Sequence, residues 1–213
     1  MRQNMEEPTV FMLFMNVTNT ITHLVLGAVA ISAIIFAIIF PGSNHLLQHV
    51  YLCVIGYVLM MAQAILTFSP HNGWSVSLSY RDKKVAHWVM QVVGAILATT
   101  GSIIRISNIA TNFQSPHGIL GLIAMILTFI SLIGGAINLY TKKTVFTTII
   151  HSCAGSLTLA AAFLALCLGF DKFVFRNVMG DTVANLSIAL TAIGLVGTLM
   201  AASISNGKRL FRR

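Results

Sequence analysis

Long apolar stretches alternate with short polar breaks along almost the whole chain. Six stretches can be separated, and each holds close to the roughly 20 apolar residues that a helix needs to cross about 30 Å of hydrocarbon. The breaks carry turn-forming residues, as in Pro41-Gly42-Ser43-Asn44 and Ser69-Pro70-His71-Asn72-Gly73. The pattern predicts six transmembrane helices, over residues 20–40, 46–68, 85–107, 117–140, 148–170 and 183–205.

Composition places the chain in the membrane class. Hydrophobic residues make up 56% of the 213 residues and charged residues only 8%, whereas a soluble domain carries about a quarter charged residues. The net charge of +8 does not indicate nucleic-acid binding, because the basic residues cluster at the ends of the apolar stretches. We therefore expect an all-α membrane protein with a short N-terminal segment (1–19), one six-helix domain (20–205) and a basic C-terminal tail (206–213).

The distribution of Lys and Arg predicts the orientation. An even number of spans puts both termini on one side of the membrane. If that side is the cytoplasm, ten basic residues lie inside and three outside, as the positive-inside rule requires. We expect cytoplasmic termini, in either an endomembrane vesicle or the plasma membrane. The inner residues are Arg2, Arg81, Lys83, Lys84, Lys142, Lys143, Lys208, Arg209, Arg212 and Arg213, and the outer ones are Arg105, Lys172 and Arg176.

Five of the seven histidines lie inside predicted spans, where an ionisable side chain indicates a functional site. Four of them, His49, His87, His117 and His151, each occupy the first turn of spans two to five. Because consecutive spans run in opposite directions, these four histidines sort into two pairs. His49 and His117 lie at the outer face, and His87 and His151 lie at the inner face.

Two histidines facing each other in a helical bundle can ligate one haem iron axially. The two pairs therefore predict two b-type haems, with irons on the order of 20 Å apart along the helices. A bare zinc or copper site is the alternative, but it favours ligands that converge at one depth together with carboxylates or thiolates. No Asp or Glu lies inside a predicted span. The fifth histidine, His23, is interpreted as a hydrogen-bonded residue at a helix end.

Each predicted ligand is followed on its own helical face by a glycine, seven or four residues later. A missing side chain at that position leaves room for a porphyrin against the helix. The alternative is that these glycines serve helix packing, as they do in many membrane proteins. The four glycines are Gly56, Gly94, Gly121 and Gly155.

These residues resemble the cytochrome b561 family, and in particular its stand-alone branch without further domains. The similarity runs from residue 20 to the C-terminus. The stretches that carry it are His49-Val-Tyr, Phe68-Ser-Pro, His87-Trp-Val-Met-Gln, Ser115-Pro-His-Gly-Ile-Leu-Gly and His151-Ser-Cys-Ala-Gly.

The resemblance implies that spans two to five form a four-helix bundle around the two haems, with spans one and six at the periphery. It also implies a transmembrane ascorbate-dependent oxidoreductase that works as a homodimer. Electrons would pass from cytoplasmic ascorbate through the inner and outer haems to ferric iron or monodehydroascorbate. The outer ascorbate motif of the family is replaced here by Gln114-Ser-Pro-His-Gly, which leaves the ferrireductase and monodehydroascorbate reductase activities as open alternatives.

Binding of the ascorbate monoanion requires cations near the inner haem. The basic residues close to the inner ends of the spans are candidates, although the positive-inside rule alone accounts for them. Arg105 is a candidate partner for a haem propionate or an outer anion. The inner candidates, with one tyrosine beside them, are Arg81, Lys83, Lys84, Tyr140, Lys142 and Lys143.

A haem-free membrane protein is the competing hypothesis. In a small transporter or a scaffold, the same histidines would be structural or would bind a divalent ion. The two hypotheses predict a different spectrum for the purified protein. A protein with bis-histidyl haem is coloured, and a haem-free protein is colourless.

Overall fold

The computed structural model describes residues 9–141 and 144–211, and side chains between residues 9 and 204. Within these residues the chain forms helices and turns and no strand, which confirms the predicted fold class. Six helical rods are long and apolar enough to cross a membrane. The elements are α1 (Thr9–Ile39), α2 (Asn44–Val54), the π-helical segment η1 (Ile55–Met61), α3 (Ala62–Leu66), α4 (Tyr80–Ser107), α5 (Pro116–Tyr140), α6 (Val145–Phe170), α7 (Phe173–Met179) and α8 (Asp181–Phe211).

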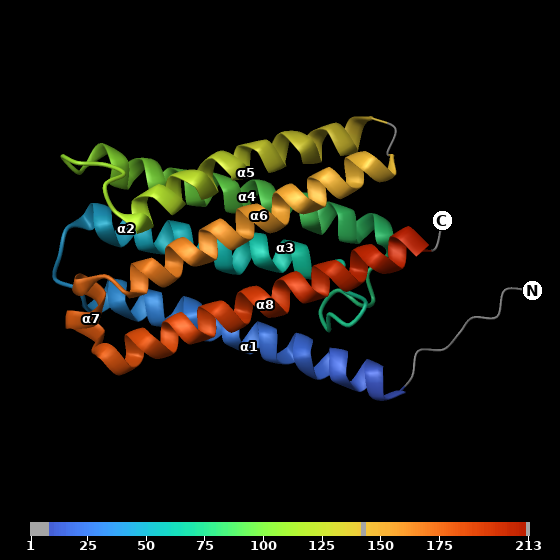
Figure 1. The fold of residues 1–213 in the computed structure, drawn as a ribbon, viewed down its shortest axis with the longest axis horizontal. Coiled ribbons are helices and arrows are strands. Elements are labelled where there is room, and N and C mark those ends of the chain that lie inside the picture. Colours follow the sequence, from blue (N-terminus) through green and yellow to red (C-terminus); the bar gives the residue numbers. More distant parts are fainter. Residues whose placement is uncertain (1–8, 142–143, 212–213) are drawn as a thin grey trace, which may run out of the picture.

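The rods lie side by side and alternate in direction (Figure 1). The second rod is continuous from Asn44 to Leu66 and consists of α2, η1 and α3. The start of α1, the end of α8 and the starts of α4 and α6 lie at one end of the bundle, which we call the terminal end. The starts of α2 and α5 lie beside α7 at the opposite end, which we call the α7 end.

The largest apolar core forms where α1 and α8 pack against the second rod and α6. Leu26, Val58 and Phe163 are almost completely buried there, at 0%, 0% and 1% exposure. The helices α1 and α8 lie along one flank of the bundle, while α4 and α5 lie on the other (Figure 1). Spans one and six are therefore peripheral, as the resemblance implied.

The start of the first helix and the end of the last differ most from those predicted. Helix α1 begins at Thr9, so most of the expected N-terminal segment 1–19 is helical. At 31 residues the helix is about 46 Å long, which exceeds the hydrocarbon thickness. Helix α8 continues through the expected tail as far as Phe211.

Polar residues in the first turns of α1 concealed its start, because they lower the local hydropathy although the helix continues through them. The side chain of Asn16 accepts a hydrogen bond from His71 Nδ1 at 3.2 Å, and Asn19 is 4% exposed. Helix α7 was not predicted because its seven residues are too few for an apolar window. It ends at Gly180, whose φ of 82° favours glycine.

The second rod and α4 approach each other closely at Gly56 and Gly94. A Cβ atom on Gly56 would lie 2.6 Å from the Gly94 carbonyl oxygen, and one on Gly94 would lie 2.8 Å from the Gly56 oxygen. Backbones can meet this closely only where side chains are absent. These contacts support the helix-packing role left open above, and a role of the two glycines beside a haem stays a prediction.

Gly56→Ala is expected to destabilise the protein by about 1–3 kcal/mol, because the new methyl group overpacks a contact that involves backbone atoms. Gly27→Ala is the matched control, since a Cβ atom there would meet nothing within 4 Å. The control should match the parent protein or slightly exceed its stability. Thermal unfolding of the three proteins in the same detergent measures the difference, and equal midpoints for both variants would contradict the packing role.

Candidate functional site

Four histidines form two facing couples at opposite ends of the bundle. His49 of α2 and His117 of α5 lie at the α7 end, with ring centroids 6.1 Å apart and ring planes at 89°. His87 of α4 and His151 of α6 lie at the terminal end, with ring centroids 6.4 Å apart and planes at 85°. The structure thus brings together the same couples that the alternation of spans predicts. Their role as iron ligands stays a prediction.

Local sequence places two of these rings near helix starts. Ser115 caps α5 by accepting a hydrogen bond from the Gly118 amide at 3.3 Å, and Pro116 occupies the first helical position. His117 follows directly. Helix α6 begins with a capping box in which Thr144 and Thr147 bond each other's backbone amides, two turns before His151.

Three of the rings donate a hydrogen bond from Nδ1 to a backbone carbonyl of a neighbouring rod. Because a carbonyl oxygen can only accept, Nδ1 carries the proton and Nε2 carries the lone pair. Metal-ligating histidines are commonly held in this way, which orients the ring and raises its basicity. The bonds join His49 to Gly101 (3.1 Å), His87 to Ala64 (2.8 Å) and His117 to Ala165 (2.7 Å).

The spacing of each couple fits two axial ligands on one metal ion. A metal–nitrogen bond of about 2 Å on each side, plus about 1.1 Å from nitrogen to ring centre, separates two axial imidazoles by about 6 Å. The observed separations of 6.1 and 6.4 Å agree with this value. The described residues contain no group of three or more His, Cys, Asp or Glu side chains that could hold a bare ion. A haem needs only two protein ligands, so the residues present fit that group.

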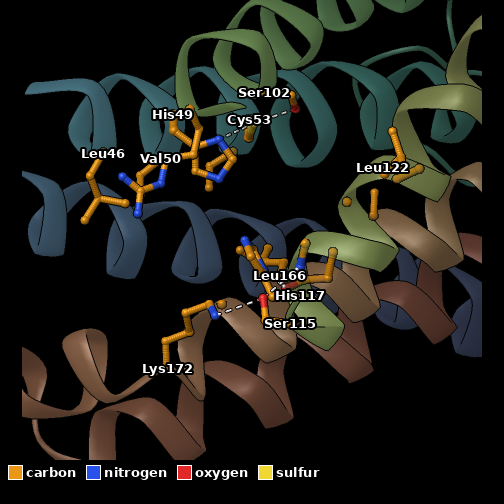
Figure 2. A pocket seen from close by; sticks show the side chains of 18 of the residues that line it. Leu46, His49, Val50, Cys53, Ser102, Ser115, His117, Leu122, Leu166 and Lys172 are labelled. Carbon is orange, nitrogen blue, oxygen red and sulfur yellow. Dashed lines mark hydrogen bonds between the residues drawn. The ribbon is translucent and has the colours of Figure 1, made fainter. Parts of the chain in front are cut away.

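A cavity of about 550 Å³ opens between His49 and His117. Most of its walls are apolar, as a macrocycle requires. Figure 2 shows the two imidazoles on opposite walls, with Lys172 extended towards Ser115. Gly121 also lines the cavity, and a Cβ atom there would meet nothing within 4 Å.

Two cations line this cavity, Arg105 and Lys172. The Lys172 ammonium donates to Ser115 Oγ at 3.3 Å. Arg105 is half-buried and has no carboxylate partner within the described ranges. The third basic residue at this end, Arg176, is engaged elsewhere, because it pairs with Asp171 and Asp181 at 2.7 and 2.8 Å. Arg105 was selected from the sequence, whereas Lys172 was not.

The terminal-end couple is connected to the surface by aromatic rings. Phe68 lies 5.0 Å from His87 between ring centroids, and the half-exposed Tyr80 lies 6.1 Å from Phe68. The Lys84 ammonium sits over the Tyr80 ring, 5.2 Å from its centroid. This arrangement places one predicted cation at the end of a ring path that leads to His87.

The remaining cation candidates have weaker structural support. Arg81 and Lys83 lie in the first turn of α4 beside Lys84, and Tyr140 is 85% exposed at the end of α5. The predicted residues Lys142 and Lys143 lie outside the described residues. These residues stay predictions.

Two glycines on facing helices were missed, because the sequence test considered only the helix that carries each histidine. A Cβ atom on Gly135 would lie 3.1 Å from His151 Cε1, and one on Gly169 would lie 3.3 Å from His117 Cε1. At both positions the missing side chain leaves room for an imidazole ring of the facing helix. Gly155 has more space, since its added Cβ atom would lie 3.6 Å from Ser131 Oγ.

Cys53 and Tyr57 were also missed, although both line the cavity. Cys53 Sγ lies 3.5 Å from His49 Nδ1, one turn further along the same helix. The Tyr57 hydroxyl lies 3.3 Å from Thr128 Oγ1 in the middle of the bundle. A Cys or Tyr within an apolar stretch gives no sequence signal of such a contact.

The other histidines have local partners. His23 Nε2 lies 2.9 Å from Asn72 Oδ1, and Asn72 Nδ2 donates to the Leu66 carbonyl at 3.1 Å. His23 is thus hydrogen-bonded as interpreted, although it lies within α1 and not at a helix end. His45 bonds Ser43 at 2.9 Å.

Comparison with known proteins gives consistent matches. A family profile for eukaryotic cytochrome b561 matches residues 48–175. The chain is similar to transmembrane reductase CYB561D2 of Bos taurus, with 26% identity over 140 residues, which is 64% of this chain and 62% of that protein. It is similar to transmembrane reductase CYB561D2 of Homo sapiens, with 29% identity over 106 residues and 48% of each chain. The matched region therefore spans less than two thirds of either relative.

The geometry predicts two haems per chain and assigns each to one couple. His49→Ala and His87→Ala should each retain about one haem, because each removes one axial ligand from a single site. His45→Ala should retain both. Haem content per chain, measured after reductive denaturation in pyridine, checks the expectation.

Spectroscopy identifies the site that each variant loses. The two single variants should lose different components of the reduced alpha band. Loss of haem in His45→Ala, or full retention in both ligand variants, would contradict the assignment.

Proposed function

The chain belongs to the cytochrome b561 family, and from this premise we propose that it passes electrons across a membrane through two b haems. The observation that carries the proposal is the pair of histidine couples at opposite ends of one bundle. Each bound haem would supply reversible one-electron chemistry at its iron. The residues of the chain hold the two groups apart, orient their ligands and exclude water.

The ligand residues supply orientation and not acid–base chemistry. The carbonyls of Gly101, Ala64 and Ala165 each hold one imidazole by its Nδ1 proton. A ring held in this way needs little rearrangement when charge at the metal changes, and its basicity favours the oxidised state. The apolar helices around the couples keep water away from both sites.

We propose cytoplasmic ascorbate as the electron donor, at the terminal end. The positive-inside rule favours this end for the cytoplasm, because Arg81, Lys83 and Lys84 lie there. Ascorbate would lose one electron and one proton and leave as monodehydroascorbate. Lys84 and Tyr80 offer a cation and a ring to this anion, and Phe68 lies between Tyr80 and His87.

At the α7 end we propose an acceptor that carries negative charge. Arg105 and Lys172 line the cavity there, and a positive site attracts anions and repels free metal cations. Monodehydroascorbate fits, as does ferric iron held in an anionic chelate, which would gain one electron to become ferrous. The homodimer implied by the resemblance stays part of the proposal.

Lys84→Gln is expected to raise the KM for ascorbate roughly two- to fivefold, because it removes one partly exposed cation from the donor site. The rate at saturating ascorbate should change little. The measurement is reduction of the haems by ascorbate in proteoliposomes. Lys172→Gln is the matched control, and an equal effect from both variants would contradict a donor site at the terminal end.

Arg105→Gln together with Lys172→Gln is expected to slow electron transfer to ferric citrate, and to reduce the salt dependence of that rate, because the steering charge is lost. The assay uses proteoliposomes loaded with ascorbate and follows ferrous iron outside. Lys84→Gln serves as the control at saturating ascorbate. An unchanged rate and salt dependence in the double variant would argue against an anionic acceptor at this site.

A further inference from the structure

The carbonyl partners of the histidines follow a reciprocal pattern. His49 of the second rod donates to Gly101 of α4, and His87 of α4 donates back to Ala64 of the second rod. Each of these two rods therefore gives a histidine to one couple and a carbonyl to the other. His117 of α5 likewise donates to Ala165 of α6, the helix that carries His151.

In regular helices the histidine and the carbonyl are 14 positions apart. The interval runs from His87 to Gly101 in α4 and from His151 to Ala165 in α6. Fourteen residues of α-helix rise about 21 Å and turn to within about 40° of four full turns. The two groups therefore face the same side of the helix at opposite ends of the bundle.

The second rod breaks this interval, because Ala64 follows His49 by 15 positions (49 to 64). In a regular α-helix fifteen residues would carry the Ala64 carbonyl about 60° past four full turns, a direction about 100° away from the one that an interval of 14 gives. This rod is also the one that contains a π-helical segment, Ile55–Met61. A π-turn holds one residue more than an α-turn, so the segment absorbs the extra residue.

Ala64 can accept from outside its own helix because it lies in the last turn of the rod, where α3 ends at Leu66. Carbonyls in the last turn of a helix have no amide donor within that helix. Ala64 is fully buried, and its methyl side chain leaves the carbonyl accessible to the His87 ring. The residue is thus suited to position an imidazole.

We propose that the π-helical segment Ile55–Met61 sets the register of the second rod, so that this rod ligates one haem through His49 and positions the ligand of the other through the Ala64 carbonyl. The inference rests on the proposed function, because the hydrogen bonds of His49 and His87 can orient haem ligands only if these two histidines bind haem. Ala64 is a positioning residue for the terminal-end haem and acts through His87.

The same interval in α5 leads to a residue near the fourth histidine. Fourteen positions after His117 in α5 is Ser131. Ser131 Oγ lies 3.6 Å from the position of a Cβ atom on Gly155, one turn beyond His151. Gly135, one turn beyond Ser131, packs against the His151 ring. This stretch of α5 therefore lies beside His151.

Deletion of one residue tests the register directly. Deleting Met60 shortens the interval in the second rod to 14, and the segment should relax to a regular α-helix with both His49 and Ala64 in place. The whole chain that lacks only Met60 is expected to keep two haems. The potential at which the terminal-end haem is half reduced should match that of the parent protein.

Deleting Ile96 is the matched control. This residue is exposed and lies between His87 and Gly101 in α4, which has no π-helical segment to absorb the change. The deletion turns the Gly101 carbonyl by about 100°, from about 40° to about 140° short of four full turns after His87. Haem affinity is expected to fall at least tenfold, as is typical when the partner of a ligating histidine is lost.

Deletion of Leu59 is measured beside that of Met60, because a single deletion can disturb folding through its own side chain. The register is supported if either variant keeps both haems and the parental half-reduction potential. It is overturned if both variants lose haem as the Ile96 deletion does, if both fail to fold, or if both fold with a shifted terminal-end potential. A colourless parent protein would instead reject the proposed haem function itself.

Discussion

An imidazole that enters a bilayer with an unsatisfied N–H group is costly, and this constraint organises the bundle. Three of the facing histidines meet it by donating to a main-chain carbonyl of a neighbouring rod. The acceptors are Ala64, Gly101 and Ala165, all residues whose small side chains let a ring approach the backbone. Glycines at the rod contacts, such as Gly56 against Gly94, serve the same need by keeping the backbones close.

The sequence was sufficient to predict the number of spans and both histidine couples. The number of spans follows from hydropathy, because each rod is an apolar stretch of the chain. The alternating direction of the spans sorts His49 with His117 and His87 with His151 without any tertiary information. The first turns of α1 were missed because Asn16 and Asn19 lower the local hydropathy, although Asn16 accepts a hydrogen bond from His71 and Asn19 is buried. Polarity along the chain does not indicate whether a side chain has found a partner.

The features that could not be predicted depend on contacts between helices. Lys172 follows His117 by 55 positions, and only the packing of α5 against α6, which α7 follows, brings it to the same cavity. Gly135 and Gly169 contact rings that belong to other rods. The π-helical segment is a property of hydrogen-bond register, and an extra residue in an apolar stretch leaves hydropathy unchanged. For these reasons Arg105 was the sole cavity cation selected from sequence.

A main-chain acceptor has a consequence for how this protein can change over evolutionary time. Substitution alters side chains and leaves every carbonyl in place, so the hydrogen bonds of the ligands are insulated from most point mutations. Gain or loss of a single codon between the two ends of a rod is the event that disrupts them. The sequences of such proteins should therefore diverge by substitution while the rods keep their length. Insertions and deletions should fall in the connections or be absorbed as a local bulge in a helix.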